Sequence, residues 1–330
     1  MAVSQTDASA APLRFRIPRT VSPEAAATLN VMYEASQQQP EPTAPESTAD
    51  FDSANQLMEA AFAPLHQQLA ASLGITTRRE TMNGVPVVRI TPRERRANGR
   101  ALVYVHGGAY VYFSSGTLVG LPALIATATG HEVISIDYTL APRAHWQVVT
   151  DQVLAVWKEL LASGFDACSI GLFGDSAGGG LAAGVTLKMR DQDLPLPAAL
   201  WLVSPWSDIT GAGDTYETLK DADPVLSPKA LAWAADAYAD AVDQKHPYVS
   251  PVYGNYTKPF PPTLIQGGTR EIFLSNFVRQ YQVIRGGGHE AVLDLYEGMP
   301  HVFHSIAPDA PESKTAIARA ALFFDGHLGG

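Results

Sequence analysis

The chain has 330 residues, 46% of them hydrophobic, which is enough for one large α/β domain with an insertion or for two domains. Its net charge is −10, from 23 basic and 33 acidic residues, and no basic patch stands out along the sequence. Nucleic acid is therefore excluded as an expected partner, and the acidic surface mainly favours solubility.

Helical and strand patterns follow one another along the chain. Two helices come first, and then Asn83-Gly84, a hairpin turn signal, separates two short strands that should be antiparallel. After them strands and helices alternate, which predicts an α/β fold with a mostly parallel sheet flanked by helices on both faces. The predicted helices are Pro23–Gln38, Phe51–Leu73, Thr117–Thr129, Val148–Ala162, Ala177–Met189, Pro228–Ala241, Ile272–Ile284 and Ala316–Phe324. The predicted strands are Ile75–Thr81, Val85–Ile90, Ala101–Val105, Val133–Ile136, Ser169–Phe173, Ala198–Val203, Thr263–Gln266 and Val292–Leu295.

One long stretch interrupts this alternation. About sixty residues separate the strand that ends near Ser204 from the strand at Thr263, and a structureless loop of that length is not expected in a compact domain. We expect it to contain an insertion that packs with the N-terminal helices as a cap. The predicted division is 1–74 and 211–248 for the two helical parts of the cap, and 75–210 with 249–330 for the catalytic core.

The compartment is suggested by two features. The single cysteine, Cys168, excludes an intrachain disulfide and fits a reducing environment, and we expect it to be a buried structural thiol. Residues 1–20 lack the apolar core of a secretory signal, and no apolar run is long enough to cross a membrane. We therefore expect a cytoplasmic protein without a stable membrane anchor.

The pentapeptide Gly174-Asp175-Ser176-Ala177-Gly178 connects a predicted strand to a predicted helix. This is the context of a nucleophile elbow, in which a sharp turn exposes a serine hydroxyl above the sheet. The helix that follows places partial positive charge where an oxyanion would develop. The motif predicts acyl transfer by Ser176, although G-x-S-x-G also occurs by chance in glycine-rich chains.

A serine nucleophile needs a base at the carboxyl end of a strand. Of the nine histidines, His301 stands in the loop after the last predicted strand, which is the correct end. His304 is the competitor, and we expect it on the surface or behind the reacting groups.

The acid that orients the base should follow the preceding strand. Glu271 is the only carboxylate in the loop after Thr263–Gln266, and we predict that it orients His301. A glutamate at a helix N-terminus is also common for purely structural reasons. Asp294 is the alternative acid, but it lies inside a strand.

A glycine loop follows the strand Ala101–Val105. Gly107 and Gly108, after His106, would supply two backbone N–H groups to an oxyanion, and Ala177 a third. A phosphate-binding loop is the alternative, but the lysine of a P-loop is missing.

With these residues assembled, the chain resembles the bacterial hormone-sensitive-lipase-like esterases of family IV, a branch of the α/β-hydrolases. The likeness covers roughly residues 75–330 and is carried by four motifs: His106-Gly107-Gly108-Ala109, Asp137-Tyr138-Thr139-Leu140-Ala141-Pro142, Gly174-Asp175-Ser176-Ala177-Gly178 and Gly298-Met299-Pro300-His301-Val302-Phe303. The resemblance implies hydrolysis of small-molecule carboxylic esters with short to medium acyl chains, without a metal or an organic cofactor. It also implies frequent homodimers, for which the last strand, Val292–Leu295, offers an exposed edge.

The chain departs from the family pattern at three positions. Ala109 replaces the usual third glycine, and Glu271 replaces the usual aspartate, so its loop should lie slightly further back. Arg143 stands where an acidic residue is common, and the sequence suggests no reason for it.

Two rival functions use the same scaffold. One is a lactone hydrolase or a dehydratase, and the other is a ligand-binding receptor. Dehydratase relatives tend to replace the serine, and receptor relatives lose the histidine. Here Ser176 and His301 are both present. The size of the substrate is not readable, since aromatic residues near these motifs are equally typical of a core. The candidates for lining a substrate pocket are Tyr110, Tyr112, Phe113, Trp206 and Tyr216.

Overall fold

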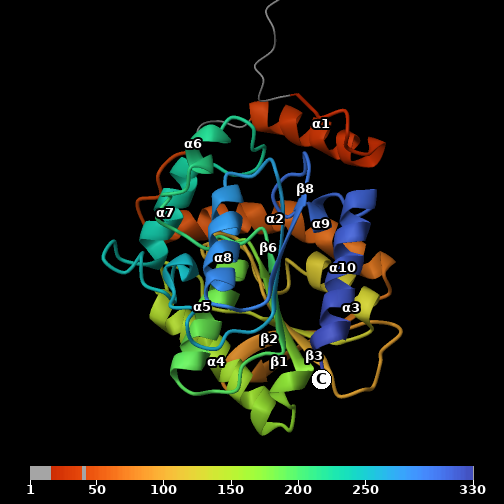
Figure 1. Ribbon diagram of the computed structural model, residues 1–330. Coiled ribbons are helices and arrows are strands. Elements are labelled where there is room, and N and C mark those ends of the chain that lie inside the picture. The colour runs from red at the N-terminus through yellow and green to blue at the C-terminus, as the bar shows by residue number, and fades with distance from the viewer. Residues whose placement is uncertain (1–15, 39–41, 330) are drawn as a thin grey trace, which may run out of the picture.

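The computed structural model describes residues 16–38 and 42–329. Its eight strands form one sheet in the order β1-β2-β4-β3-β5-β6-β7-β8 (Figure 1). The strands are β1 (Thr76–Met82), β2 (Val85–Thr91), β3 (Ala101–Val105), β4 (Glu132–Ile136), β5 (Ile170–Asp175), β6 (Ala199–Val203), β7 (Thr263–Gly268) and β8 (Ala291–Tyr296). The pairs β1–β2 and β2–β4 are antiparallel and all others are parallel, which confirms the predicted α/β fold.

The eight predicted helices are present with shifted ends, and two helices of a single turn, α6 and α9, were not predicted. They are α1 (Pro23–Gln38), α2 (Thr48–Ser72), α3 (Gly120–Thr129), α4 (Trp146–Ala162), α5 (Ala177–Asp191), α6 (Thr215–Thr218), α7 (Pro228–Tyr238), α8 (Leu274–Gly286), α9 (Phe303–Ile306) and α10 (Pro311–His327), with short 3₁₀ turns at Ala167–Ser169 and Pro251–Tyr253. α10 begins five residues earlier than predicted, because Pro311 is well suited to the first turn of a helix, where its missing N–H costs no hydrogen bond.

The hairpin between β1 and β2 has the predicted turn. Asn83 and Gly84 have φ values of 46° and 81°, and two consecutive positive φ values are what a tight hairpin of this kind requires. Met82 then pairs with Val85, so the turn determines the register of the hairpin.

The core lies on both faces of the sheet. All five residues of β3 are buried, and they alternate between the faces: Val103 and Val105 belong to the hydrophobic cluster that contains side chains of α4 and α5, whereas Leu102 and Tyr104 belong to the cluster that contains side chains of α3 and α10. Figure 1 shows α3 and α10 on one side of the sheet and α5 and α8 on the other. This double cover explains why the parallel strands are continuous apolar runs.

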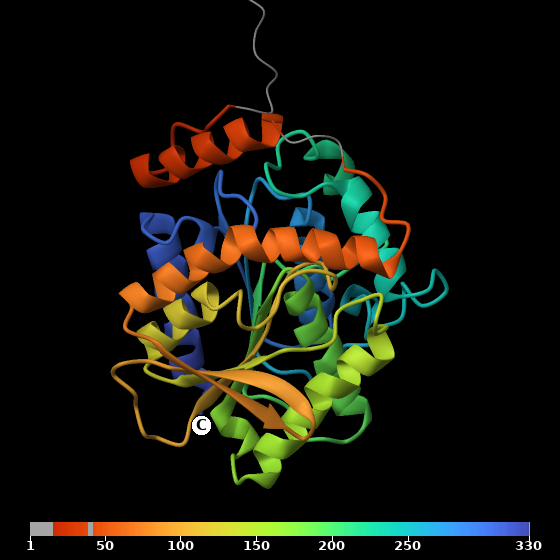
Figure 2. The same cartoon turned by 180° about the vertical axis from the view of Figure 1, so that it is seen from behind.

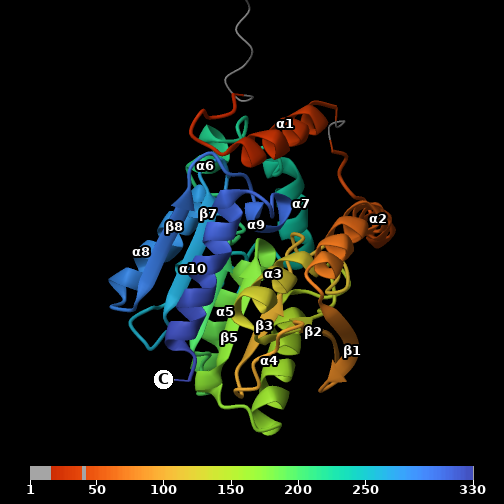
Figure 3. The same ribbon diagram turned by 90° about the vertical axis from the view of Figure 1, so that its right-hand side faces the viewer.

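Four helices that are distant in sequence gather at one end of the sheet. In Figure 1 α1 and α6 lie at the upper end of the molecule and α2 and α7 lie below them, level with the upper part of the sheet; the reverse view in Figure 2 shows α2 crossing in front of the strands. Figure 3 shows that this end carries the loops after β7 and β8. The helices thus lie over the carboxyl edge, where an open parallel sheet binds its ligands.

Cys168 differs from the prediction, because its side chain is exposed. It lies in the 3₁₀ turn that precedes β5, rather than within the strand, so it does not share the burial of that strand. No helix in the described part of the chain combines the length and hydropathy that crossing a bilayer requires.

Ser176 occupies a strained turn between β5 and α5. Its φ is 55° and its ψ is −123°, outside the regions favoured by residues with a side chain. The turn is held by hydrogen bonds from the Ser176 N–H to the Val203 oxygen at 2.8 Å and from the Trp206 N–H to the Ser176 oxygen at 2.8 Å. A Cβ on Gly178 would overlap the carbonyl oxygen of Val105, so only glycine lets α5 approach β3 this closely.

We predict that Gly178→Ala destabilises the protein by about 3 kcal/mol, because the new methyl group meets backbone that cannot move aside. Thermal unfolding followed by circular dichroism measures the effect. Gly286→Ala is the matched control: its Cβ would meet no atom within 4 Å, so we expect a change within about 0.5 kcal/mol. Equal unfolding temperatures for the two variants would contradict the close approach.

Candidate active site

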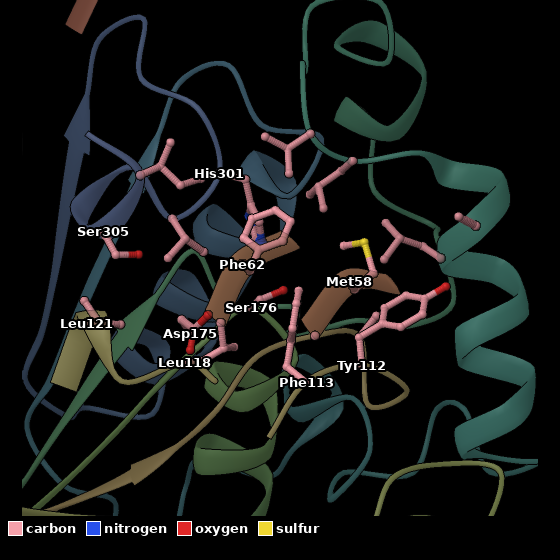
Figure 4. Close-up of a pocket in the computed structure, with 18 of the residues that line it drawn as sticks. Met58, Phe62, Tyr112, Phe113, Leu118, Leu121, Asp175, Ser176, His301 and Ser305 are labelled. Atoms are coloured by element: carbon pink, nitrogen blue, oxygen red, sulfur yellow. The ribbon is translucent and has the colours of Figure 1, made fainter. Parts of the chain in front are cut away.

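Ser176 lies in a cavity of about 430 Å³ at the carboxyl edge of the sheet (Figure 4). Residues of α2 and α7 form part of the wall, and His301, Tyr112 and Phe113 contribute from loops. The lining is mostly apolar, with a few polar groups near the serine. Its size and composition are those of a site for a small organic molecule.

His301 and Glu271 form a buried hydrogen-bonded pair next to this cavity. The His301 Nδ1 and the Glu271 Oε2 are 2.7 Å apart, and the glutamate is inaccessible to solvent. Both residues follow strands, β8 and β7, that are neighbours in the sheet. The structure therefore brings together Ser176, His301 and Glu271, as the sequence predicted.

The second oxygen of Glu271 is also held. Its Oε1 accepts a hydrogen bond from the Gly268 N–H at 2.6 Å and another from the Ser204 hydroxyl at 2.8 Å. The Ser204 Oγ in turn accepts the N–H of Val302, the residue after His301, at 3.1 Å. Ser204, which the sequence reasoning missed, thus connects the carboxylate to the histidine loop.

The environment of His301 changes its basicity. Burial lowers the pKa of His301, but the hydrogen bond and the negative charge of Glu271, helped by Asp223 and Asp175, outweigh burial and raise this pKa above its ordinary value. A carboxylate beside an imidazole favours the protonated ring, which is the form that a base reaches when it accepts a proton.

The acid loop is tied to helices far away in the sequence. Asp223 accepts the Ile272 N–H at 2.9 Å, and burial raises the pKa of this carboxyl to about 6. The guanidinium of Arg270 donates to the hydroxyl of Tyr33 in α1 at 3.0 Å, and that hydroxyl donates to the carbonyl of Ala222. The segment around residue 222 and α1 are therefore both anchored next to Glu271.

The N–H group of Gly107, in the glycine loop, has a hydrogen-bond partner within the protein. The Gly107 N–H donates to the Oδ1 of Asp175 at 3.0 Å, and the Tyr104 hydroxyl donates to the same oxygen. Burial raises the pKa of Asp175, while these two hydrogen bonds and the nearby histidines oppose the rise. The Gly107 amide thus has a buried partner in this structure, and the oxyanion bond predicted for it would have to replace the bond to Asp175; the next amides along the chain are those of Gly108 and Ala109.

His106 supports the glycine loop from below. Its Nδ1 lies 2.7 Å from the Gly107 oxygen, and its ring stacks on Tyr138 with centroids 4.2 Å apart. Burial lowers the pKa of His106, so the ring is neutral and its Nδ1–H donates to that carbonyl. This histidine orders the loop rather than exchanging protons with a ligand.

The helix α2 is bonded to the segment that follows the glycine loop. Asn55 accepts the Phe113 N–H at 2.6 Å, Glu59 accepts the Thr117 hydroxyl at 2.8 Å, and the ring nitrogen of His66 accepts the Gly120 N–H at 3.3 Å. Arg143, which the sequence left unexplained, forms an ion pair with Asp52 on the same helix. The positions 52, 55, 59 and 66 share one helical face, a polar spacing that could have indicated these contacts.

Three of the five aromatic candidates belong to the core and not to the cavity. Tyr110, Trp206 and Tyr216 are at most 6% exposed and lie among stacked aromatic rings. Tyr112 and Phe113 do line the cavity. The positive φ values of 66° at Tyr110 and 70° at Phe113 reverse the chain direction there, which the sequence does not reveal.

The competing residues lie elsewhere. Asp294 accepts hydrogen bonds from Gln266 and Tyr296 and pairs with Arg319, away from His301. His304 is buried against Gln266, at 3.2 Å from its side-chain oxygen, and is thus not on the surface. Among residues 16–38 and 42–329, no group of three or more His, Cys, Asp or Glu side chains is placed to hold a metal ion.

Comparison with known proteins agrees with this architecture. The family model of the α/β hydrolase fold matches residues 102–305. An acetyl-hydrolase of Streptomyces hygroscopicus is 32% identical over 70% of this chain and 77% of its own length. The solved structure of an esterase from the bacterial hormone-sensitive lipase family superposes with a TM-score of 0.82 at 32% identity, covering 93% of this chain and 99% of the other. The solved structure of an esterase/lipase from an uncultured bacterium gives a TM-score of 0.83 at 29% identity, covering 94% of this chain and 100% of the other.

The chain belongs to the α/β-hydrolase fold family, whose sheet and strand-end loops it reproduces. Within that family it is a member of the hormone-sensitive-lipase-like esterases of family IV, and it is a carboxylesterase of the serine hydrolase class.

We predict that Ser204→Ala lowers the free energy of unfolding by about 1–3 kcal/mol, because it removes a hydrogen bond to a buried carboxylate and leaves the Val302 N–H without its acceptor. Urea unfolding measures the difference. Ser53→Ala, at an exposed hydroxyl that bonds only within α2, serves as the control and should change stability by less than about 0.5 kcal/mol. No difference between the two variants would refute the linking position of Ser204.

Proposed function

We propose that the protein hydrolyses small-molecule carboxylic esters with short to medium acyl chains through a covalent acyl-serine intermediate. The observation that carries the proposal is the 2.7 Å contact between Glu271 and His301 beside the cavity that contains Ser176. Acyl transfer requires a nucleophile, an acid and a base, and the chain offers a strained serine, a buried acid and an imidazole in this order after β5, β7 and β8.

In the first step, the Ser176 oxygen attacks the ester carbonyl carbon while His301 accepts the hydroxyl proton. The C–O bond to the alcohol then breaks, and His301 returns that proton to the leaving oxygen. In the second step a water molecule attacks the acyl-serine, with His301 again as the base, and the carboxylic acid and free Ser176 are released. Glu271 stays ionised throughout, keeps the imidazole in the required tautomer and stabilises its protonated form.

The negative oxygen of the tetrahedral intermediate needs backbone donors. We assign this function to the N–H groups of Gly108, Ala109 and Ala177. Ala177 is the first residue of α5, and the first amides of a helix have no partner within the helix. The Gly107 amide contributes indirectly, since its bond to Asp175 holds the loop in place.

We also propose that 1–74 and 211–248 act as a cap over the catalytic core formed by 75–210 and 249–330. The contacts of Tyr33, Asp223 and the polar face of α2 with strand-end loops support this division. A homodimer through β8 stays a prediction, which the edge position of β8 and the exposure of Val292 and Leu295 favour. The cytoplasmic location also stays a prediction.

Replacing the proposed nucleophile tests the mechanism. We predict that Ser176→Ala abolishes turnover of p-nitrophenyl butyrate, with a loss of at least about 10⁴-fold in kcat, while the unfolding temperature stays within a few degrees of the wild type. The matched control is Ser305→Ala, at a serine that lines the same cavity but takes no part in the steps above; it should retain turnover within about tenfold. Substantial residual turnover in Ser176→Ala would sink the mechanism.

The pH dependence tests the pairing of Glu271 with His301. The base must be neutral to accept a proton, so the raised pKa of His301 places the acidic limb of the kcat/KM profile above pH 6.5, with activity lost as the pH falls through it. In Glu271→Gln the charge is gone and burial dominates, so we expect the limb to move to lower pH and the rate to fall by about 10²–10⁴-fold. If the acidic limb of Glu271→Gln lies at the same pH as that of the wild type, Glu271 is not the acid that orients His301.

A further inference from the structure

A second cavity, of about 880 Å³, lies between α1 and α2 next to the catalytic cavity. Met32 and Ala35 contribute from α1, and Leu65 and Leu69 contribute from α2. None of these four residues lines the catalytic cavity. The second cavity therefore extends beyond the catalytic one, and much of its wall comes from the two helices that we assign to the cap.

The two cavities adjoin each other along a shared wall. Six residues line both of them: Met58, Phe62, His66, Val225, Ser305 and Ile306. In the view of Figure 4 the ring of Phe62 overlaps His301, and both side chains line the catalytic cavity with Ser176. This ring packs edge-on against Phe113, with centroids 5.4 Å apart, and so stands on the boundary between the two spaces. A ligand whose reacting end is at Ser176 can extend past Phe62 into the second cavity.

The side chains that line the second cavity determine which kind of ligand fits it. Most of the side chains are apolar, and one of them, Leu65, is 64% exposed and so open to a ligand. Burial lowers the pKa of His66 to about 4, so this ring is neutral at physiological pH. Among the described residues that line the cavity none is Lys or Arg, and Asp309 would repel an anion. An anionic headgroup does not fit, whereas an uncharged alkyl chain matches the apolar lining.

We propose that the second cavity binds the distal part of a long alkyl chain of an ester whose carbonyl lies at Ser176. The proposal rests on the proposed ester hydrolysis and names the substrate class more closely: esters with one short limb and one linear apolar limb that is longer than the catalytic cavity holds. Transfer of each methylene from water into an apolar site improves binding by up to about fourfold, so a few methylenes suffice to change the preferred substrate.

The test is a chain-length series with variants that fill or charge only the second cavity. Ala35→Trp fills it and Leu65→Asp places a charge in it, and neither residue lines the catalytic cavity. The matched controls are Ala27→Trp, at an exposed alanine of α1, and Leu57→Asp, at a leucine of α2 that is 74% exposed; neither lines a cavity. The substrates are p-nitrophenyl butyrate, p-nitrophenyl laurate and dodecyl acetate, each kept below the concentration at which it aggregates.

We expect kcat/KM for the long esters to fall at least tenfold in Ala35→Trp and Leu65→Asp and to stay within about twofold in both controls, with butyrate turnover unchanged in all four. Loss on laurate assigns the cavity to the acyl limb, and loss on dodecyl acetate assigns it to the alcohol limb. Chain-length profiles identical to the wild type, with butyrate still hydrolysed, would overturn the proposal and leave the cavity to another occupant, such as a protein segment. Absence of butyrate turnover in the wild-type protein would instead count against the proposed function.

Discussion

The conformation of Ser176 depends on one close backbone approach, between the β5–α5 turn and β3. Gly178 allows it, because any side chain there would meet the carbonyl oxygen of Val105. The approach places the first turn of α5 at the carboxyl edge of the sheet and forces Ser176 to a φ of 55°. Hydrogen bonds with Val203 and Trp206 keep the turn in this strained form. The strain is thus maintained by the packed sheet around it, as is usual where a side chain must be presented to a ligand.

The buried carboxylate of Glu271 is the second constraint. An ionised group without solvent needs several hydrogen bonds, and Glu271 receives them from Gly268, Ser204 and His301. The first two hold one oxygen and leave the other for the imidazole. The longer side chain of glutamate, compared with the usual aspartate, is accommodated because it folds back onto the amide of Gly268, three residues earlier in its own loop. The acid and base are therefore positioned as one unit rather than as two independent side chains.

The helix α2 contacts both the loops at the carboxyl edge of the sheet and the two cavities. Its polar face accepts hydrogen bonds from Phe113 and Thr117 through Asn55 and Glu59, next to the glycine loop. Its apolar face, with Phe62, borders both cavities. Because one rigid element contacts both, a shift of α2 would change the shape of the substrate space and the position of the loop together. This coupling gives a physical reason why α2 is hydrogen-bonded to the loops at the carboxyl edge of the sheet rather than only packed against them.

The sequence by itself determined the α/β fold, the strand-to-helix turn at Ser176 and the pairing of His301 with Glu271. These follow from local patterns and from the rule that parallel strands present their carboxyl ends at one edge. Only the tertiary structure decided that the Gly107 amide bonds to Asp175, that Tyr110 and Trp206 belong to the core, and that Ser204, 67 residues before Glu271, holds the acid. The reason is physical: which donor meets which acceptor, and which ring faces a cavity, depends on contacts between segments far apart in the chain, which no local periodicity encodes.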